Sequence, residues 1–355
     1  MTPRQRVLAA LRGEMADKVP FTAYECMIPQ CTAERRLRNE GLCIVARTVP
    51  VVRTTTPNVR TETYTYEEKG VSYRRTIHRT PVGDLSTLAR PVGFTSWHVE
   101  RIFRKPEDYK PLLFMIRDRQ CCPNYEEFLR AEADYGEDGF FRGGVGATPL
   151  HEIMIGMMGV QKFAEEWVDR RDEVMKLYDA LVAHLRRVYP LLADSPALAF
   201  NFGGNETGDV MGRERFARYV MPHYAECAEY LRKRGKLLGS HLDGNNRVWA
   251  DLVAASALDY IEAFTPAPDT DMSLADARRA WPDKALWINF PSSVHLSSIE
   301  TIEATTRRLL REAAPGDRFL VGITEDVPEE RWRGNFLAIS RVLNSEGRLP
   351  GAGGS

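Results

Sequence analysis

Three short apolar stretches decide the fold: Lys236-Leu-Leu-Gly-Ser-His241, Leu258-Asp-Tyr-Ile-Glu262 and Ala285-Leu-Trp-Ile-Asn289. Helical patterns over residues 247–256 and 274–281 separate them. Short apolar strands that alternate with helices indicate parallel βαβ units. We therefore expect one parallel sheet, in which all three stretches end at the same edge.

The same alternation extends in both directions along the chain. Five βα units in the second half, with two or three strands before them, come to about eight strands, which favours a closed (β/α)8 barrel (TIM barrel) over an open doubly wound sheet. We expect an α/β protein with one barrel domain over residues 1–350. The other strands are expected over residues 19–25, 43–52, 139–146, 197–201 and 318–325.

A different pattern interrupts the barrel near the N-terminus. Thr61-Glu-Thr-Tyr-Thr-Tyr-Glu-Glu alternates in polarity, Lys69-Gly70 is a turn pair, and Val71-Ser-Tyr-Arg-Arg-Thr-Ile follows. Two alternating runs around a short turn predict a β-hairpin with one solvated face. We expect a hairpin insertion over about residues 53–90 of the barrel domain. Residues 351–355 are expected to form a flexible tail.

The composition limits the kinds of molecule that the protein is expected to bind. The 355-residue chain is 43% hydrophobic and has a net charge of -1, so it has no field to attract nucleic acid or an anionic membrane. We expect a small-molecule substrate, no nucleic acid and no membrane. There is no signal-peptide pattern and no apolar run of about 18 residues. The six cysteines include no CxxC pair, which favours a reduced, cytoplasmic protein.

Polar side chains end most of the expected strands. In a barrel the carboxyl ends of the strands carry the chemistry. Buried acidic and amide groups need partners, so a whole set of them favours a site. The alternative is that they cap the following helices, as Asp and Asn often do. The set is Tyr24, Glu25, Asn201, Glu206, His241, Asp243, Glu262, Asn289 and Glu325.

His241-x-Asp243 is the sharpest pattern in this set. Residues two apart on a strand point to the same face, and imidazole and carboxylate both bind metals. Glu262 and Glu325 would complete a ring of metal ligands from neighbouring strands. A hydrogen-bonded His–Asp pair without metal remains the alternative interpretation.

Several segments carry a family resemblance. Met1-Thr-Pro-Arg-Gln-Arg-Val-Leu, Glu206-Thr-Gly-Asp, Tyr219-Val-Met-Pro-His-Tyr and Gly239-Ser-His-Leu-Asp-Gly resemble blocks of the uroporphyrinogen decarboxylase superfamily. The resemblance covers nearly the whole chain and implies a (β/α)8 barrel. Thr80-Pro-Val-Gly-Asp-Leu-Ser resembles the cobalamin-dependent methyltransferase-like members, in which it follows an inserted hairpin.

One segment departs from the true decarboxylases of that superfamily. They have an arginine-containing segment near the N-terminus that meets the propionates of the tetrapyrrole. The matching place here reads Phe21-Thr-Ala-Tyr-Glu-Cys-Met, which has no arginine and has a carboxylate that would repel an anion. The resemblance therefore favours the methyltransferase-like branch.

That branch implies a zinc site and a corrinoid acceptor. Its members hold zinc with His-x-Cys and a later Cys; here His241 matches and Asp243 replaces the first thiolate. Glu262 lies at a fitting place, and Glu325 stands where the second thiolate would be. A zinc ion with oxygen ligands is a harder Lewis acid than one with thiolate ligands, and it is suited to polarise an ether oxygen. O-demethylases, which move a methyl group from a methoxy aromatic to a corrinoid-binding protein, are the nearest fit.

The resemblance and the strand ends together give these expected roles. Glu206 would donate a proton where zinc does not polarise the oxygen. The expected catalytic residues are Glu206, His241 and Glu262; the expected substrate-binding residues are Tyr24, Glu25, Asn201 and Asn289; the expected metal ligands are His241, Asp243, Glu262 and Glu325.

Two other functions remain open on the sequence. One is a metal-independent decarboxylase or lyase of a small carboxylic acid, with His241 and the carboxylates as acid–base groups. The other is a barrel that binds a corrinoid or tetrapyrrole without turning it over. A homodimer is compatible with the sequence.

Overall fold

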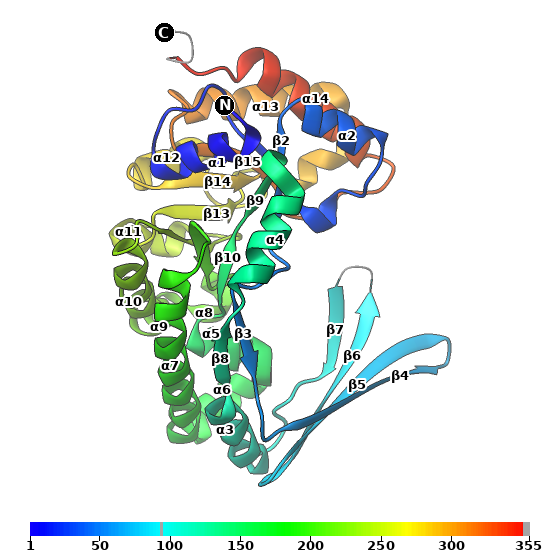
Figure 1. Ribbon diagram of the computed structural model, residues 1–355, viewed down its shortest axis with the longest axis vertical. Helices are drawn as coiled ribbons and strands as arrows, with labels where there is room; N and C mark the ends of the chain where they lie inside the picture. Colours follow the sequence, from blue (N-terminus) through cyan, green and yellow to red (C-terminus); the bar gives the residue numbers. More distant parts are fainter. Residues whose placement is uncertain (93–94, 351–355) are drawn as a thin grey trace. The chain divides into compact units, whose positions relative to one another are not determined.

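The apolar stretches form a parallel sheet in the computed structural model, which describes residues 1–92 and 95–350 (Figure 1). Residues 351–355, where the sequence predicts a tail, lie outside the described residues. The spatial order of the strands is β10 (Gly143–Gly146), β11 (Ala199–Phe202), β12 (Leu237–His241), β13 (Tyr260–Phe264), β14 (Ala285–Asn289), β15 (Phe319–Ile323), β1 (Phe21–Tyr24), β2 (Leu42–Ala46) and β9 (Gly139–Phe141).

This sheet closes into a barrel. All of its neighbouring pairs are parallel. The two ends of the strand order, β9 and β10, are separated along the chain by Arg142 alone. They act as one interrupted strand, so the sheet is an eight-stranded barrel with helices between its strands. The fold class expected from the sequence is confirmed.

The barrel belongs to the first of two compact units, which comprises Met1–Val51, Asn124–Gly146 and Ala193–Ser355. Its helices are α1 (Pro3–Arg12), α2 (Thr32–Asn39), α4 (Tyr125–Tyr135), α8 (Gly208–Met211), α9 (Arg213–Tyr219), α10 (Met221–Arg232), α11 (Ala250–Ala255), α12 (Leu274–Ala280), α13 (Ile299–Ala313) and α14 (Trp332–Glu346). Within the described part of the chain, no helix has the length and apolar character needed to cross a membrane.

Helix α1 covers the amino-terminal end of the barrel. Its first turn is capped by Thr2, and it ends at Gly13, whose left-handed backbone (φ 75°) terminates the helix. Arg4 of α1 donates to the carbonyl of Gly139, the first residue of β9, at 2.7 Å. The buried core inside the barrel contains apolar residues of α1 together with Trp287 of β14. The amino-terminal end is closed by packing, and the carboxyl end is left for chemistry.

One expected helix is broken in two. The sequence predicts a continuous helix over residues 212–234, but α9 ends at Tyr219 and α10 begins at Met221. Pro222 lies in the first turn of α10, where its missing N–H costs nothing, and it is disfavoured inside a longer helix.

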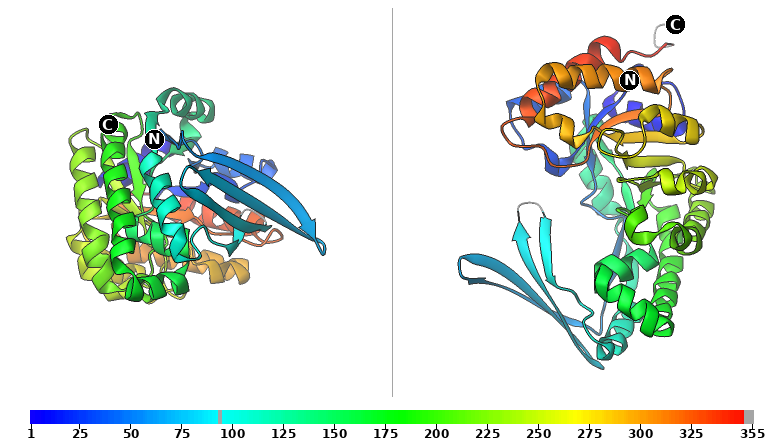
Figure 2. Two further views of the ribbon diagram at one scale, coloured as in Figure 1. Left: turned by 90° about the horizontal axis from the view of Figure 1, so that it is seen from below. Right: turned by 180° about the vertical axis from the view of Figure 1, so that it is seen from behind.

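The second unit comprises Val52–Pro123 and Ala147–Leu192. It contains two antiparallel sheets and several helices (Figure 2). The elements are β3 (Val52–Thr55), β4 (Arg60–Glu68), β5 (Val71–Thr80), β6 (Gly83–Val92), β7 (Thr95–Glu100), α3 (Tyr109–Asp118), β8 (Gln120–Pro123), α5 (Pro149–His151), the π-helical segment η4 (Glu152–Met158), α6 (Val160–Asp169) and α7 (Arg171–Asp194), the last two residues of which belong to the first unit.

The expected hairpin is part of a larger sheet. Strands β4 and β5 pair across Lys69 and Gly70, which both have positive φ (52° and 74°), as a two-residue hairpin turn requires. Pairing continues through β6 to β7, so the sheet has four strands and extends to Glu100, beyond the expected residue 90.

Candidate active site at the carboxyl end of the barrel

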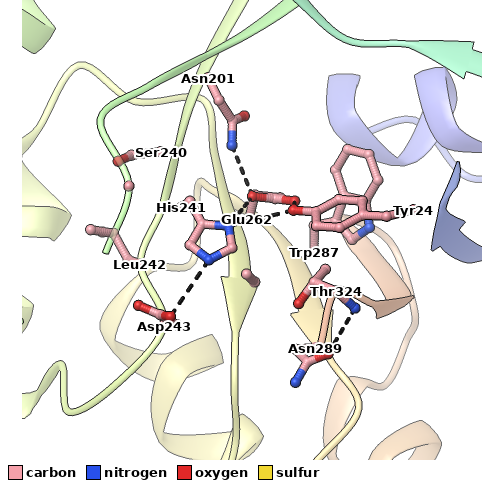
Figure 3. Close-up of polar contacts among 12 residues, drawn as sticks. Tyr24, Asn201, Ser240, His241, Leu242, Asp243, Glu262, Trp287, Asn289 and Thr324 are labelled. Atoms are coloured by element: carbon pink, nitrogen blue, oxygen red, sulfur yellow. Dashed lines mark hydrogen bonds and ion pairs between the residues drawn. The ribbon is translucent and has the colours of Figure 1, made fainter. Parts of the chain in front are cut away.

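His241 and Glu262 lie side by side at the carboxyl end of the barrel (Figure 3). His241 is the last residue of β12, Glu262 lies within β13, and the two are partners in the register of this parallel pair. Register partners on neighbouring strands share a face of the sheet. Nδ1 of His241 is 2.8 Å from Oε2 of Glu262, so the imidazole donates a hydrogen bond to the carboxylate. The structure thus brings two of the expected site residues together.

Donors from three other strand ends occupy both oxygens of the Glu262 carboxylate. Tyr24 donates its hydroxyl to Oε1, and Asn201 donates Nδ2 to Oε2 at 2.8 Å. Arg142 forms an ion pair with Oε2 at 3.3 Å. A fully buried carboxylate is stable only when it is paired and hydrogen-bonded in this way. Burial alone would raise the pKa of Glu262, but the charges of Arg142 and His241 outweigh it and lower the pKa to about 2.

The imidazole of His241 is held in its charged form. Burial alone would lower its pKa, but the carboxylates of Glu262 and Asp243 outweigh burial and raise the pKa to about 10. Nδ1 is committed to Glu262, whereas Nε2 is 3.6 Å from Oδ2 of Asp243, beyond ordinary hydrogen-bond distance. At neutral pH the ring therefore carries a proton on Nε2, which faces Asp243 in an ion pair and not in a short hydrogen bond.

A β-bulge aims Glu262 into the site. The register between β13 and β14 shifts between Glu262 and Phe264, and the residue between them, Ala263, has φ 58°. Alanine in this left-handed conformation costs about 1–2 kcal/mol, and bulges often redirect side chains beside active sites. The strain lies next to a carboxylate that accepts hydrogen bonds from Tyr24, Asn201 and His241.

An outer set of contacts holds these groups in place. The hydroxyl of Tyr260 lies 2.7 Å from Oδ1 of Asn201 and 2.8 Å from the carbonyl of Phe200, so its one proton is shared between these two acceptors. This leaves the amide nitrogen of Asn201 facing Glu262. On the other side, the guanidinium of Arg47 lies 3.4 Å from the ring centroid of Tyr24, a close cation–π contact.

Asn289 and Glu325 belong to a neighbouring network. Asn289 accepts the backbone N–H of Thr324 at 3.0 Å and donates to the hydroxyl of Ser292 at 3.3 Å. The same hydroxyl is hydrogen-bonded to Glu325. Both side chains thereby join the loops that follow β14 and β15. The sequence places Glu325 with His241, but the structure gives its carboxylate a different partner.

Glu206 and Glu25 also have local partners. Oε2 of the buried Glu206 accepts the backbone N–H of Gly204 at 2.7 Å, within the loop that follows β11. Oε1 of Glu25 accepts the backbone N–H of Arg47 at 3.1 Å. Glu25 also lines a pocket of about 310 Å³ with residues such as Tyr135, and His241 is not part of its lining.

The expected zinc ligands do not fit a metal site. Across residues 1–92 and 95–350, no group of three or more His, Cys, Asp and Glu side chains is placed to hold a metal ion. Two of the expected ligands already have partners. The oxygens of Glu262 contact Tyr24, Asn201, His241 and Arg142, and the carboxylate of Glu325 is hydrogen-bonded to Ser292. Only Nε2 of His241 and the carboxylate of Asp243 remain, fewer than the three protein ligands of a catalytic zinc.

Three contributors to the site were missed at the level of sequence. Arg142 interrupts a strand, Arg47 directly follows β2, and Tyr260 lies at the start of β13. The sequence reasoning selected acidic and amide groups at strand ends and passed over arginine. Arg47 could have been found from its position, since it directly follows the apolar run of β2, whereas Arg142 lies inside the expected strand 139–146.

Comparisons with known proteins agree with this architecture. A sequence profile described as uroporphyrinogen decarboxylase (URO-D) matches residues 144–331, just over half of the chain. A methyltransferase from Methanosarcina mazei has a similar structure, with a TM-score of 0.59 and 14% sequence identity over 97% of this chain and 98% of that one. No curated protein sequence matches the chain. The chain belongs to the uroporphyrinogen decarboxylase (URO-D) family.

Proposed function

We propose that the chain transfers a methyl group from a small methoxy-aromatic substrate to a corrinoid acceptor. The observation that carries the proposal is the charged imidazole of His241, fixed by Glu262 at the carboxyl end of the barrel. A methyl ether is a poor substrate for displacement because its leaving group is an anion. A positioned proton donor removes that obstacle.

His241 supplies the proton at its Nε2 atom. As the bond between the methyl carbon and the ether oxygen breaks, its electron pair stays on oxygen and the proton of His241 moves to that oxygen. A phenol has a pKa near that of tyrosine, about 10, so transfer from a group with a pKa of about 10 is close to balanced. The phenol leaves with that proton, and a new proton from solvent restores the charged imidazole of His241. A reduced corrinoid, when bound, supplies the nucleophile that takes the methyl group.

The residues around His241 are assigned positioning roles. Glu262 fixes Nδ1, which directs Nε2 away from the buried network. Tyr24 and Asn201, expected from the sequence to bind substrate, use their donor groups on Glu262 instead. Asp243 keeps the imidazole charged from the other side. No step passes through a metal, because the donor set does not fit one.

His241 replaces Glu206 as the assigned proton donor. Glu206 is buried in its own loop and accepts a backbone N–H, so its carboxylate serves the loop. Both residues are expected from the sequence to be catalytic. Charge and placement favour His241.

Decarboxylation of a small carboxylic acid is the second candidate, and Arg47 favours it. Its guanidinium follows β2 at the same end of the barrel with 32% of the side chain exposed, and it lies 3.9 Å from the carboxylate of Glu25, which a substrate carboxylate would have to replace. His241 would then protonate the carbon from which carbon dioxide has left.

One set of assays separates the two functions. The protein is incubated with 2-methoxyphenol and cob(I)alamin without oxygen, and loss of cob(I)alamin absorbance and release of catechol are followed. We expect turnover in the wild type and a rate lower by about 10²–10⁴-fold in His241→Gln. Glu325→Gln is the control and should stay close to the wild type.

The other outcomes are equally informative. Release of carbon dioxide from small aromatic acids, with no catechol from 2-methoxyphenol, favours the decarboxylase. Zinc quantified in the same preparations should be well below one ion per chain in both the wild type and His241→Gln. One zinc per chain that is lost in His241→Gln would restore the metal site expected from the sequence.

A further inference from the structure

A cavity lies within the second unit, away from the residues of the barrel site. Its volume is about 380 Å³, near the lower end of the roughly 300–1,000 Å³ that small-molecule pockets occupy. All of its lining residues come from the range Val52–Pro123, and none of them is a residue discussed above for catalysis. The cavity therefore has a chemistry of its own.

One face of α3 forms most of the lining. Lys110, Leu113, Phe114 and Arg117 follow the spacing i, i+3, i+4 and i+7, which places them in one stripe along the helix. The two apolar side chains in the middle of the stripe are half-buried, and the two cations at its ends are exposed. The stripe therefore offers an apolar floor with a positive charge at each end.

The turn between β5 and β6 forms a second wall. It contributes Val82, whose backbone N–H donates to the hydroxyl of Thr80 at 3.2 Å, and that hydroxyl donates to the carbonyl of Gly83 at 2.6 Å. A Cβ atom at Gly83 would lie 3.5 Å from Cγ of Pro111, so the turn already lies against α3. These contacts hold the turn beside the helix, where Val82 adds to the apolar part of the lining.

The carboxylate of the lining has partners of its own. Oδ2 of Asp118 accepts the backbone N–H of Asn58 at 2.8 Å, and Oδ1 accepts the side-chain amide of Asn58 at 2.7 Å. Among the residues that the structure describes, the side chains of Lys110 and Arg117 have neither a hydrogen bond nor an ion pair. Two positive charges and one negative charge give the lining a net charge of +1. The cavity therefore favours an anion.

A ligand that matches this lining has a flat apolar body and a carboxylate. Arginine binds carboxylates through two parallel hydrogen bonds and also stacks on aromatic rings. The ring of Phe114 favours an aromatic body over an open chain, because aromatic rings attract one another beyond the effect of buried area.

We infer that this cavity binds a small aromatic carboxylate. Its ring lies against Leu113 and Phe114, and its carboxylate pairs with Arg117. Lys110, about two helical turns away, adds a weaker attraction. This inference is independent of the reaction at the barrel.

Isothermal titration calorimetry with 2-naphthoate, up to about 1 mM, tests the inference. We expect the wild type to bind one molecule per chain and Arg117→Gln to bind at least about tenfold more weakly, because a charged, bidentate contact is lost. Lys110→Gln should have a smaller effect in the same direction. Arg74→Gln removes an exposed arginine of β5 outside the cavity, so it is the matched control and should bind as the wild type does. Circular dichroism verifies that each variant is folded.

Two related compounds test the class of ligand. 2-Naphthamide has the same rings without the charge, and octanoate has the charge without the rings. Both should bind more weakly than 2-naphthoate. Equal binding of 2-naphthamide would contradict the role of the cations, and equal binding of octanoate would overturn the assignment of an aromatic ligand.

Binding at the barrel is distinguished by His241→Gln. This variant should bind 2-naphthoate as the wild type does. A loss of binding in His241→Gln, with none in Arg117→Gln, would place the acid at the barrel and overturn the inference. A wild type that binds no 2-naphthoate at the highest concentration would overturn it as well.

Discussion

The carboxyl end of the barrel and the four-stranded sheet β4–β7 differ in which side chains they bury and which they expose. At the mouth, Glu262, Arg142 and His241 are withdrawn from water and bonded to one another. On the sheet, Trp97 and Tyr64 are left in water. Neither arrangement is what stability alone favours, since buried charges cost desolvation and exposed aromatics forgo burial. The first arrangement indicates chemistry.

The largest effect is expected from breaking the buried charge network. Glu262→Gln removes the negative charge that compensates Arg142 and His241 and should lower the free energy of unfolding by about 3–5 kcal/mol. Urea denaturation measures the difference. Glu325→Gln, at an exposed carboxylate, is the control and should change stability by less than about 1 kcal/mol. Equal effects of the two substitutions would contradict the network described for Glu262.

A smaller effect is expected one step further out. Tyr260→Phe removes the hydroxyl that bonds Asn201 and the carbonyl of Phe200, leaving buried acceptors unpaired at a cost of about 1–3 kcal/mol. Tyr64→Phe is the matched substitution on the sheet and should fall within about 0.5 kcal/mol of the wild type. Thermal unfolding of both variants makes the comparison. A neutral Tyr260→Phe would mean that Asn201 is not held as described.

Stability should depend on pH in a defined direction. The folded-state pKa of His241 is raised to about 10, so its contribution is complete below the ordinary value near 6.5 and is lost as pH rises through 10. The pKa of Glu262 is lowered to about 2, so its contribution is complete above about 4.5 and is lost as pH falls through 2. Wild type should therefore lose stability relative to His241→Gln between pH 7 and 10. A constant difference over that range would argue against a charged His241.

The smallest effect is expected at the most exposed aromatic residue. Trp97→Ala should change the free energy of unfolding by no more than about 0.5 kcal/mol, because the side chain is 68% exposed. Its rate with a free corrinoid acceptor should equal that of the wild type. A loss of stability comparable to that of Tyr260→Phe would show that Trp97 packs against the chain itself.

Much of the barrel is predictable because its strands are local. In apolar runs such as Leu237–His241 and Ala285–Asn289, the length of the strand, its burial and its polar last residue can all be read from the run itself. Their placement therefore follows from the pattern alone. The contact between His241 and Glu262 follows from the parallel register of neighbouring strands. The turn at Lys69 and Gly70 is equally local.

The rest of the site depends on features that no short pattern contains. Arg142 reaches Glu262 only because a strand is interrupted at that residue, and Ala263 sets the direction of Glu262 through a bulge. Glu325 ends an apolar strand as His241 does, yet its side chain is taken by Ser292. Tyr24, Asn201, His241 and Glu262 are expected from the sequence and lie together in the structure, but the hydrogen-bond partners of each residue decide what it does.

The charge state of His241 tests the account most directly. In protein labelled with ¹⁵N at histidine, the His241 signals are assigned by their absence from the spectrum of His241→Gln and followed as pH is raised. We predict that both ring nitrogens remain protonated through pH 8 and that the imidazole titrates near pH 10. Titration near the ordinary value of about 6.5 would contradict the pre-charged proton donor on which the proposed reaction depends.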